Sequence, residues 1–177
     1  KKDQKQKEMT WSLWIKVIAA VIPSAVLGLL LDDWMDANLY NHVVVAITLV
    51  AYGVAFIYIE QRNRGLAPKV KSVHAIDMRT ALLIGCFQCL SLIPGTSRSG
   101  STILGGILLG VGRAAASEFS FFLAIPTMLG ASFLKMVKFL FAGVGMTFTE
   151  FFVLIFGCAV SFVVSLFVIR KLMEYVR

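Results

Sequence analysis

The sequence predicts an all-α, polytopic membrane protein with four spanning helices and one re-entrant helix–loop–helix. Two observations lead to this fold class. Of the 177 residues, 58% are apolar and only 15% are charged, whereas a soluble domain carries roughly 25% charged residues. The apolar residues also form blocks of membrane length, one of which is interrupted by a polar, glycine-rich motif. This pattern excludes a disordered chain, a coiled coil and an ordinary soluble enzyme.

Four apolar blocks are predicted to cross the membrane, because about 20 helical residues span a hydrocarbon core about 30 Å thick. These blocks are residues 11–31, 37–59, 119–137 and 151–169. Pro23 and Pro126 lie inside two of them, where a membrane helix tolerates proline as a kink. Between the blocks we expect an acidic loop at 32–36, a polar loop at 60–79 and a loop or interfacial piece at 139–149.

The block 80–112 differs from the other four. It has 33 residues and one charge, Arg98, and its middle reads PGTSRSGST from Pro94 onward. Proline, glycine and hydroxyl side chains all disfavour a continuous helix. The remaining halves, 80–93 and 99–112, have 14 residues each and reach about 21 Å, too short to span. We therefore expect two half-helices that meet at a loop within the membrane, which requires protein or a wet cavity around that loop.

The distribution of charge favours re-entry of this block over a crossing. Basic residues gather in segments 1–8, 60–79 and 170–177, whereas segment 32–36 holds three aspartates. Re-entry places all three basic segments on the cytoplasmic side, as the positive-inside rule requires, and a crossing would place the last one outside. Both ends of the sequence are therefore expected to be cytoplasmic. The net charge of +7 is explained by these loops, and no nucleic-acid partner is expected.

The polar loop is the natural place to divide the chain. Residues 1–79 would hold two transmembrane helices and the basic loop, and residues 80–177 the re-entrant pair and two further transmembrane helices. The sequence starts with Lys1 and stops just after an apolar block, so we expect it to be a piece of a longer protein.

Arg98 carries the functional hypothesis. A charge at mid-membrane costs roughly 2.5–3.5 kcal/mol on insertion scales, so an interaction must offset that cost. One interpretation is a structural arginine bonded to backbone carbonyls. The other is an anion site, because a guanidinium stays charged and binds two phosphate oxygens at once.

The neighbours of Arg98 favour the anion site. Gly95 and Gly100 let the backbone turn closely around a ligand, and the second half-helix would point its free N–H groups into the loop. The hydroxyl donors are Ser97, Ser99, Ser101 and Thr102. The expected ligand is an amphiphile with a phosphate head and a hydrocarbon tail. A Walker A loop is excluded because Ser101 stands where its lysine belongs.

Two segments carry a resemblance to a known family. Residues 85–102, GCFQCLSLIPGTSRSGST, and residues 116–126, ASEFSFFLAIP, resemble segments of the bacterial undecaprenyl-diphosphate phosphatases, the bacitracin-resistance family. The resemblance extends from residue 11 to the last span. It implies hydrolysis of undecaprenyl diphosphate to the monophosphate in the bacterial plasma membrane, which recycles the lipid carrier of cell-wall synthesis. It also implies two inverted-topology repeats, each with a re-entrant pair.

The resemblance assigns roles to the residues of the motif. Arg98, Ser97 and Thr102 match catalytic positions, with Arg98 holding the diphosphate. We expect the substrate-binding residues to be Gly95, Thr96, Ser99, Gly100, Ser101 and Gln88. For Gln88 two interpretations stay open, since its amide either faces the loop or bonds a neighbouring helix.

The resemblance also implies what this sequence lacks. The family's glutamate-rich first signature would precede Lys1 and its final span would follow Arg177. The acid–base carboxylates and the ligands of a divalent cation, Mg²⁺ or Ca²⁺, are therefore expected outside this sequence, which alone should be inactive. The alternative function is a lipid-phosphate or anion transporter or flippase, because broken helices at mid-membrane are also a transporter feature. A purely structural scaffold is disfavoured by the cost of Arg98.

Overall fold

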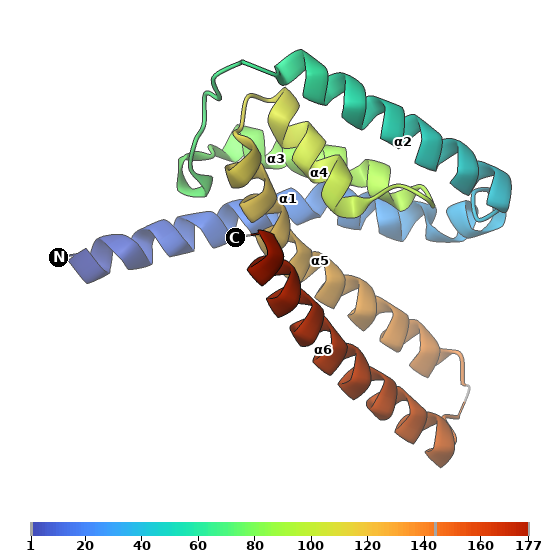
Figure 1. Cartoon of the computed structure of the whole chain (residues 1–177). Coiled ribbons are helices and arrows are strands. Elements are labelled where there is room, and N and C mark those ends of the chain that lie inside the picture. Colours follow the sequence, from blue (N-terminus) through green and yellow to red (C-terminus); the bar gives the residue numbers. More distant parts are fainter. Residues whose placement is uncertain (1, 144, 177) are drawn as a thin grey trace. The chain divides into compact units, whose positions relative to one another are not determined.

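The computed structural model describes residues 2–143 and 145–176, in which every regular element is a helix. The all-α prediction is thus confirmed. The helices are α1 Lys2–Asn38, α2 His42–Asn63, η1 Val73–Ala75, α3 Met78–Gln88, η2 Cys89–Leu92, α4 Arg98–Leu108, α5 Arg113–Phe141 and α6 Phe148–Val176 (Figure 1).

Four helices are long and apolar enough to cross a membrane, as predicted. The candidate spans are Lys7–Asn38, His42–Asn63, Arg113–Phe141 and Phe148–Lys171. In α2 no residue is buried, and the described side chains of α6 are exposed although most are apolar. Apolar surface on this scale suits contact with lipid and not with water. The protein is a multi-pass α-helical membrane protein.

The predicted acidic loop at 32–36 is wrong, because α1 continues through it to Asn38. Charged residues end a membrane span but are compatible with a helix outside the hydrocarbon core. The helix ends where Asn38 Nδ2 donates to the carbonyl of Trp34 at 2.8 Å. Asn41 then caps α2, its side chain accepting from the N–H groups of Val43 and Val44.

The predicted connection at 139–149 is shorter in the structure. The helix α5 runs on to Phe141, and α6 begins at Phe148, where Glu150 Oε2 accepts from the backbone N–H of Thr147 at 2.8 Å. Residue 144 lies outside the described residues. The chain forms two compact units, one ending at Ala131 and the other beginning at Ser132. The predicted division into repeats at residue 79 stays a prediction.

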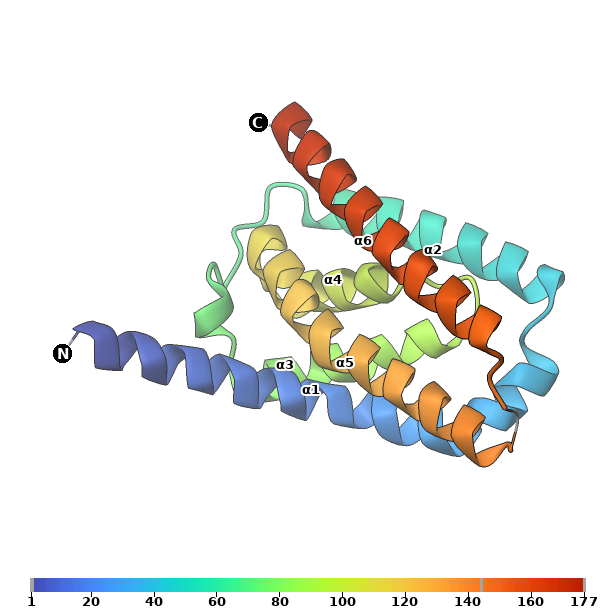
Figure 2. The same ribbon diagram turned by 90° about the horizontal axis from the view of Figure 1, so that it is seen from below.

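The predicted helix–loop–helix is present as α3, η2 and α4, which lie between α1 and α2 (Figures 1 and 2). The helices α3 and α4 have 11 residues each, about 16 Å, and neither spans a membrane. We call residues 78–108 the hairpin. Its glycines permit close packing, since a Cβ on Gly106 would lie 2.9 Å from the Cβ of Ala116 on α5.

The hydrophobic core lies where α1, α3 and α5 meet. Val17 and Ala20 of α1, Ile84 of α3, and Phe119 and Leu123 of α5 are all at most 1% exposed and belong to one cluster. The hairpin is therefore packed against α1 and α5 by the hydrophobic effect, so the residues at its tip have a fixed support.

Both ends of the hairpin lie together. The segment before α3 bonds the turn after α4, with the N–H of Lys69 donating to the carbonyl of Gly110 at 2.9 Å and that of Gly112 to Val70 at 2.7 Å. The chain thus enters and leaves the hairpin at one place, a geometry compatible with re-entry, which stays a prediction.

Contacts with α1 show how far the hairpin extends along that helix. Lys16 Nζ contacts the carbonyl of His74, in the segment before α3, while Leu92 near the tip lies 3.6 Å from where a Cβ on Gly28 would be. Twelve helical residues separate Lys16 from Gly28, about 18 Å. Gly28 lies three residues, about 4.5 Å, before the end of the predicted span 11–31. The hairpin therefore extends along most of the span of α1, and its tip lies towards the end of that span opposite to Lys16.

Candidate functional site

The turn at the tip of the hairpin is held by α2. The hydroxyl oxygen of Thr48 lies 2.8 Å from the carbonyl oxygen of Pro94, and 2.9 and 3.0 Å from those of Val44 and Val45 in its own helix. Gly95 has a φ of +89°, which only glycine adopts readily, and a Cβ there would lie 2.8 Å from the carbonyl oxygen of Val45. Gly95 thus lets the turn pack directly on α2.

The side chain of Thr96 stabilises the same turn by hydrogen bonding to its backbone. Its hydroxyl lies 2.7 Å from the carbonyl oxygen of Leu90 and 2.6 Å from that of Ile93. A threonine hydroxyl has one proton, and here that proton is directed to the backbone. The side chain predicted to bind substrate therefore stabilises the turn in this structure.

Ser97 begins α4 as its N-cap. Its Oγ accepts from the N–H of Gly100 at 3.2 Å and lies 3.3 Å from the Oγ of Ser99. Ser97 is exposed and Ser99 is half-buried. The cap satisfies one of the first N–H groups of the helix and leaves those of Arg98 and Ser99 without an intrahelical acceptor. These N–H groups and the positive end of the helix dipole favour an anion.

Arg98 occupies the first position of α4 and is half-buried. Its Nη1 lies 3.5 Å from the carbonyl oxygen of Ser120 on α5, a long hydrogen bond. Among the side chains that the structure describes, no carboxylate lies within ion-pair distance of this guanidinium. A guanidinium has five N–H donors in total, so most of those of Arg98 have no acceptor among the described residues.

Arg98 and the start of α4 place two positive sources together. The helix dipole is equivalent to roughly half a positive charge at its N-terminus, so it repels the guanidinium and does not neutralise it. An anion near the start of α4 would interact favourably with both positive charges. This electrostatic arrangement is the strongest feature of the site.

Thr102 lies one turn further along α4 and is fully buried. Its hydroxyl lies 3.0 Å from the carbonyl oxygen of Ser99 and 2.7 Å from the Oγ of Ser120. Thr102 therefore faces α5, not a space where a ligand would bind. The geometry gives it a supporting contact.

Ser101 and Gly100 face α2. Ser101 is 1% exposed, and its Oγ lies 3.0 Å from both the hydroxyl of Tyr52 and the carbonyl oxygen of Ser97. A Cβ on Gly100 would lie 2.9 Å from the ring of Phe56. Both residues hold α4 against α2.

Gln88 ends α3 and is fully buried. Its Nε2 donates to Ser24 Oγ on α1 at 2.7 Å and to Thr127 Oγ1 on α5 at 3.3 Å. Within residues 2–143 and 145–176, its Oε1 is buried without a hydrogen-bond partner. Of the two interpretations of Gln88, the geometry favours the bond to neighbouring helices.

The structure therefore divides the predicted site residues into two groups. Arg98, Ser97 and Ser99 are at least partly accessible and carry donors that protein groups do not fully use. The others pack on neighbouring helices or close the turn; they are Gly95, Thr96, Gly100, Ser101, Thr102 and Gln88. The catalytic and binding roles of both groups stay predictions.

Comparison with known proteins identifies the family. The chain matches the family described as bacitracin resistance protein BacA over residues 1–177. The chain belongs to this family. It is 51% identical over 176 residues to an undecaprenyl-diphosphatase of Streptococcus mutans serotype c, covering 99% of this chain and 63% of that relative. It is also 54% identical over 177 residues to an undecaprenyl-diphosphatase of Limosilactobacillus fermentum, covering 100% of this chain and 64% of that relative.

The resemblance to the bacitracin-resistance family is thus confirmed. A third relative, the undecaprenyl-diphosphatase of Enterococcus faecalis strain V583, is 51% identical over 177 residues and is covered to 64%. The chain therefore spans less than two thirds of the length of these curated relatives.

One residue that contacts the site, Ser120, was not predicted from the sequence. Ser120 contacts both Arg98 and Thr102, yet in the sequence it is a single hydroxyl inside an apolar block. The available signal is its spacing from Thr127, since residues seven apart lie on the same face of a helix. Thr127 bonds Gln88, so this face of α5 contacts both halves of the hairpin.

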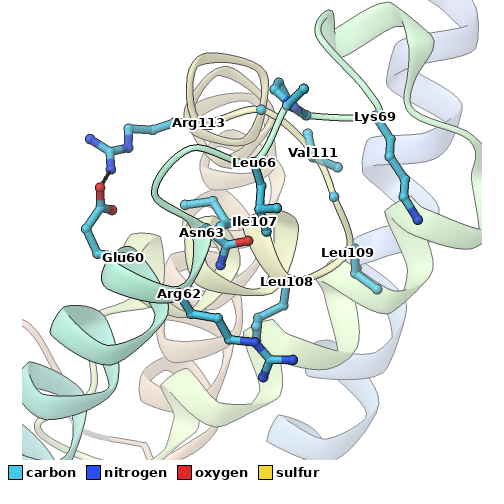
Figure 3. Close-up of a pocket in the computed structure, with 14 residues that line it drawn as sticks. Glu60, Arg62, Asn63, Leu66, Lys69, Ile107, Leu108, Leu109, Val111 and Arg113 are labelled. Carbon is cyan, nitrogen blue, oxygen red and sulfur yellow. Dashed lines mark hydrogen bonds and ion pairs between the residues drawn. The ribbon is translucent and has the colours of Figure 1, made fainter.

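A pocket of about 520 Å³ lies at the other end of the hairpin. It is lined by the end of α2, part of the segment before α3 and residues 107–113. Figure 3 shows the ion pair of Glu60 with Arg113 on one side of it. No predicted site residue lines this pocket, so it is separate from the tip.

Proposed function

We propose that this chain is part of an integral membrane phosphatase that hydrolyses undecaprenyl diphosphate to undecaprenyl phosphate and inorganic phosphate. The observation that carries the proposal is the positive charge of Arg98 at the first position of α4, which no carboxylate of the described residues pairs with. Membership of the BacA family and the names of the curated relatives support it.

Each accessible residue has a role in this proposal. The guanidinium of Arg98 binds oxygens of the diphosphate and stabilises the charge that develops when the anhydride bond breaks. The free N–H groups of α4 and the hydroxyls of Ser97 and Ser99 orient the head group. The polyprenyl tail remains among the exposed apolar helices, in the bilayer.

The proposal includes a divalent cation, Mg²⁺ or Ca²⁺, on the basis of family resemblance. The described residues contain no group of three or more His, Cys, Asp or Glu side chains placed to hold a metal ion. The residues at the tip thus do not form a metal site on their own, and we assign no step to the cation here. Its ligands and the acid–base carboxylates would come from the part of the relatives that this chain does not cover.

We also propose an orientation in the bacterial plasma membrane, with both ends of this chain on the cytoplasmic side. The basic segments before α3 and at the two ends support it through the positive-inside rule.

The direct experiment measures phosphate release from undecaprenyl diphosphate by the purified full-length protein. A phosphatase releases inorganic phosphate from the lipid, whereas a transporter or flippase moves the lipid across a vesicle membrane without cleaving it. Lipid translocation without phosphate release would contradict the proposal. Residues 1–177 alone are expected to release no phosphate.

A further inference from the structure

Ser120 of α5 contacts α4 at two points. Its carbonyl oxygen lies 3.5 Å from Nη1 of Arg98, and its hydroxyl oxygen lies 2.7 Å from that of Thr102. Ser120 is 2% exposed and Thr102 is 0% exposed. The same residue therefore contacts the guanidinium and the helix that carries it.

Chemistry determines which of the two hydroxyls donates. Thr102 has one hydroxyl proton, and its oxygen also lies 3.0 Å from the carbonyl oxygen of Ser99 and 3.2 Å from that of Arg98. Carbonyl oxygens only accept hydrogen bonds, so Thr102 donates its proton to one of these two carbonyls. Ser120 then donates its proton to Thr102. This hydrogen bond joins α5 to α4 between two buried side chains, where a polar group without a partner costs free energy.

We propose that Ser120 is a positioning residue that fixes Arg98 for the reaction, an inference that rests on the proposed function. A guanidinium that binds a diphosphate needs a defined orientation, because small displacements from the productive geometry cost rate. Arg98 lies at the first position of α4, where helix ends fray. The Ser120–Thr102 hydrogen bond holds α4 one turn further on, and the carbonyl of Ser120 limits the swing of the arginine side chain.

Thr127 provides a matched control on the same face of α5. Its hydroxyl also accepts a hydrogen bond from the hairpin, but from Gln88 of α3. Within the described residues it forms no hydrogen bond with Arg98. Loss of either hydroxyl removes one hydrogen bond between α5 and the hairpin, which is buried for Ser120 and partly buried for Thr127. Only loss of the Ser120 hydroxyl removes a hydrogen bond to α4, at Thr102, one turn from Arg98. The backbone carbonyl of Ser120, which contacts Arg98, is unchanged by the substitution.

The test is a double-mutant cycle on phosphate release by the full-length protein. We expect Ser120→Ala to lower kcat about tenfold with KM changed less than about twofold, since the loss concerns an oriented transition state. The double variant Ser120→Ala/Arg98→Lys should have a kcat less than about twofold below that of Arg98→Lys alone, because the effect of Ser120 on kcat acts through the arginine. Thr127→Val should lower kcat by the same factor with and without Arg98→Lys.

Two further measurements separate positioning from folding. Thermal unfolding of Ser120→Ala and Thr127→Val should show comparable losses of stability, and Ser120→Thr, which keeps the hydroxyl, should restore kcat. Wild-type kcat in Ser120→Ala, or effects of Ser120→Ala and Arg98→Lys that multiply, would overturn the inference. A wild-type protein that releases no phosphate would instead overturn the proposed function on which the inference rests.

Discussion

At the scale of single residues, the electrostatics of Arg98 are the main feature. A charged side chain inside a membrane costs roughly 2.5–3.5 kcal/mol on insertion scales. The described residues offer this guanidinium one long hydrogen bond and no carboxylate within ion-pair distance, and the N-terminus of α4 adds a second positive source. This arrangement is the physical reason why we propose an anionic head group as the ligand.

Gly95 provides a prediction at the same scale. Gly95→Ala should destabilise the protein by about 1–3 kcal/mol, because the φ of +89° and the proximity of Thr48 and Val45 both oppose a Cβ. The control is Gly53→Ala in α2, where a Cβ meets nothing within 4 Å. That substitution should be neutral or stabilise by up to about 1 kcal/mol. Thermal unfolding in detergent measures both, and equal effects of the two variants would contradict this description of the turn.

At the scale of elements, the start of α3 depends on one carboxylate. Asp77 is its N-cap and accepts from the N–H of Thr80 at 3.2 Å. Hydrogen bonds from the Thr80 side chain and backbone hold the pKa of Asp77 below its usual value of 3.8. A carboxyl group whose pKa is lowered by folding stabilises the folded state at pH values above its pKa in the unfolded chain. This stabilisation is lost as the pH falls through the pKa of the folded state.

We therefore expect the first turn of α3 to open more often below about pH 4. Hydrogen exchange at Thr80, corrected for the intrinsic pH dependence of exchange, should show reduced protection there. Asp77→Asn keeps a capping oxygen without a titrating group, so its protection should not vary with pH in this range. Protection in the wild type that is unchanged between pH 7 and pH 3 would exclude the cap as a source of stability.

Helix boundaries show which parts of an element can be read from sequence. The membrane spans follow from apolar length alone, but α1 continues past Asp32, Asp33 and Asp36 to Asn38. Hydropathy locates the edge of the hydrocarbon core, whereas helix ends depend on caps such as Asn41 and Asp77. A side-chain cap is a local contact that several residue types can make, so its position is harder to predict.

At the scale of the whole molecule, the hairpin was predictable and its contacts were not. Its two short halves and the PGTSRSGST turn are visible in the sequence, and they predict the broken helix that the structure contains. The supports at Thr48, Tyr52 and Ser120 are long-range contacts. Nothing in the local pattern indicates which hydroxyls of the motif face a ligand and which face a neighbouring helix.

Re-entry has a direct topological test. The hydrogen bonds of Lys69 with Gly110 and of Gly112 with Val70 join the two ends of the hairpin. Single cysteines at Gly65 and Ala114, in a protein whose native cysteines are replaced, should thus react with a membrane-impermeant maleimide from the same side. That side should be cytoplasmic. Labelling from opposite sides would show that the chain crosses the membrane between these residues.

The central claim is that Arg98 binds the diphosphate through its fork of donors, and one measurement tests it most directly. It is kcat for phosphate release from undecaprenyl diphosphate by the full-length protein carrying Arg98→Lys. The control is Arg113→Lys, the same change at an exposed arginine paired with Glu60. Lysine keeps the charge but loses the fork, so we predict a fall of about 100-fold or more for Arg98→Lys and wild-type kcat for Arg113→Lys. Wild-type turnover by Arg98→Lys would contradict the account.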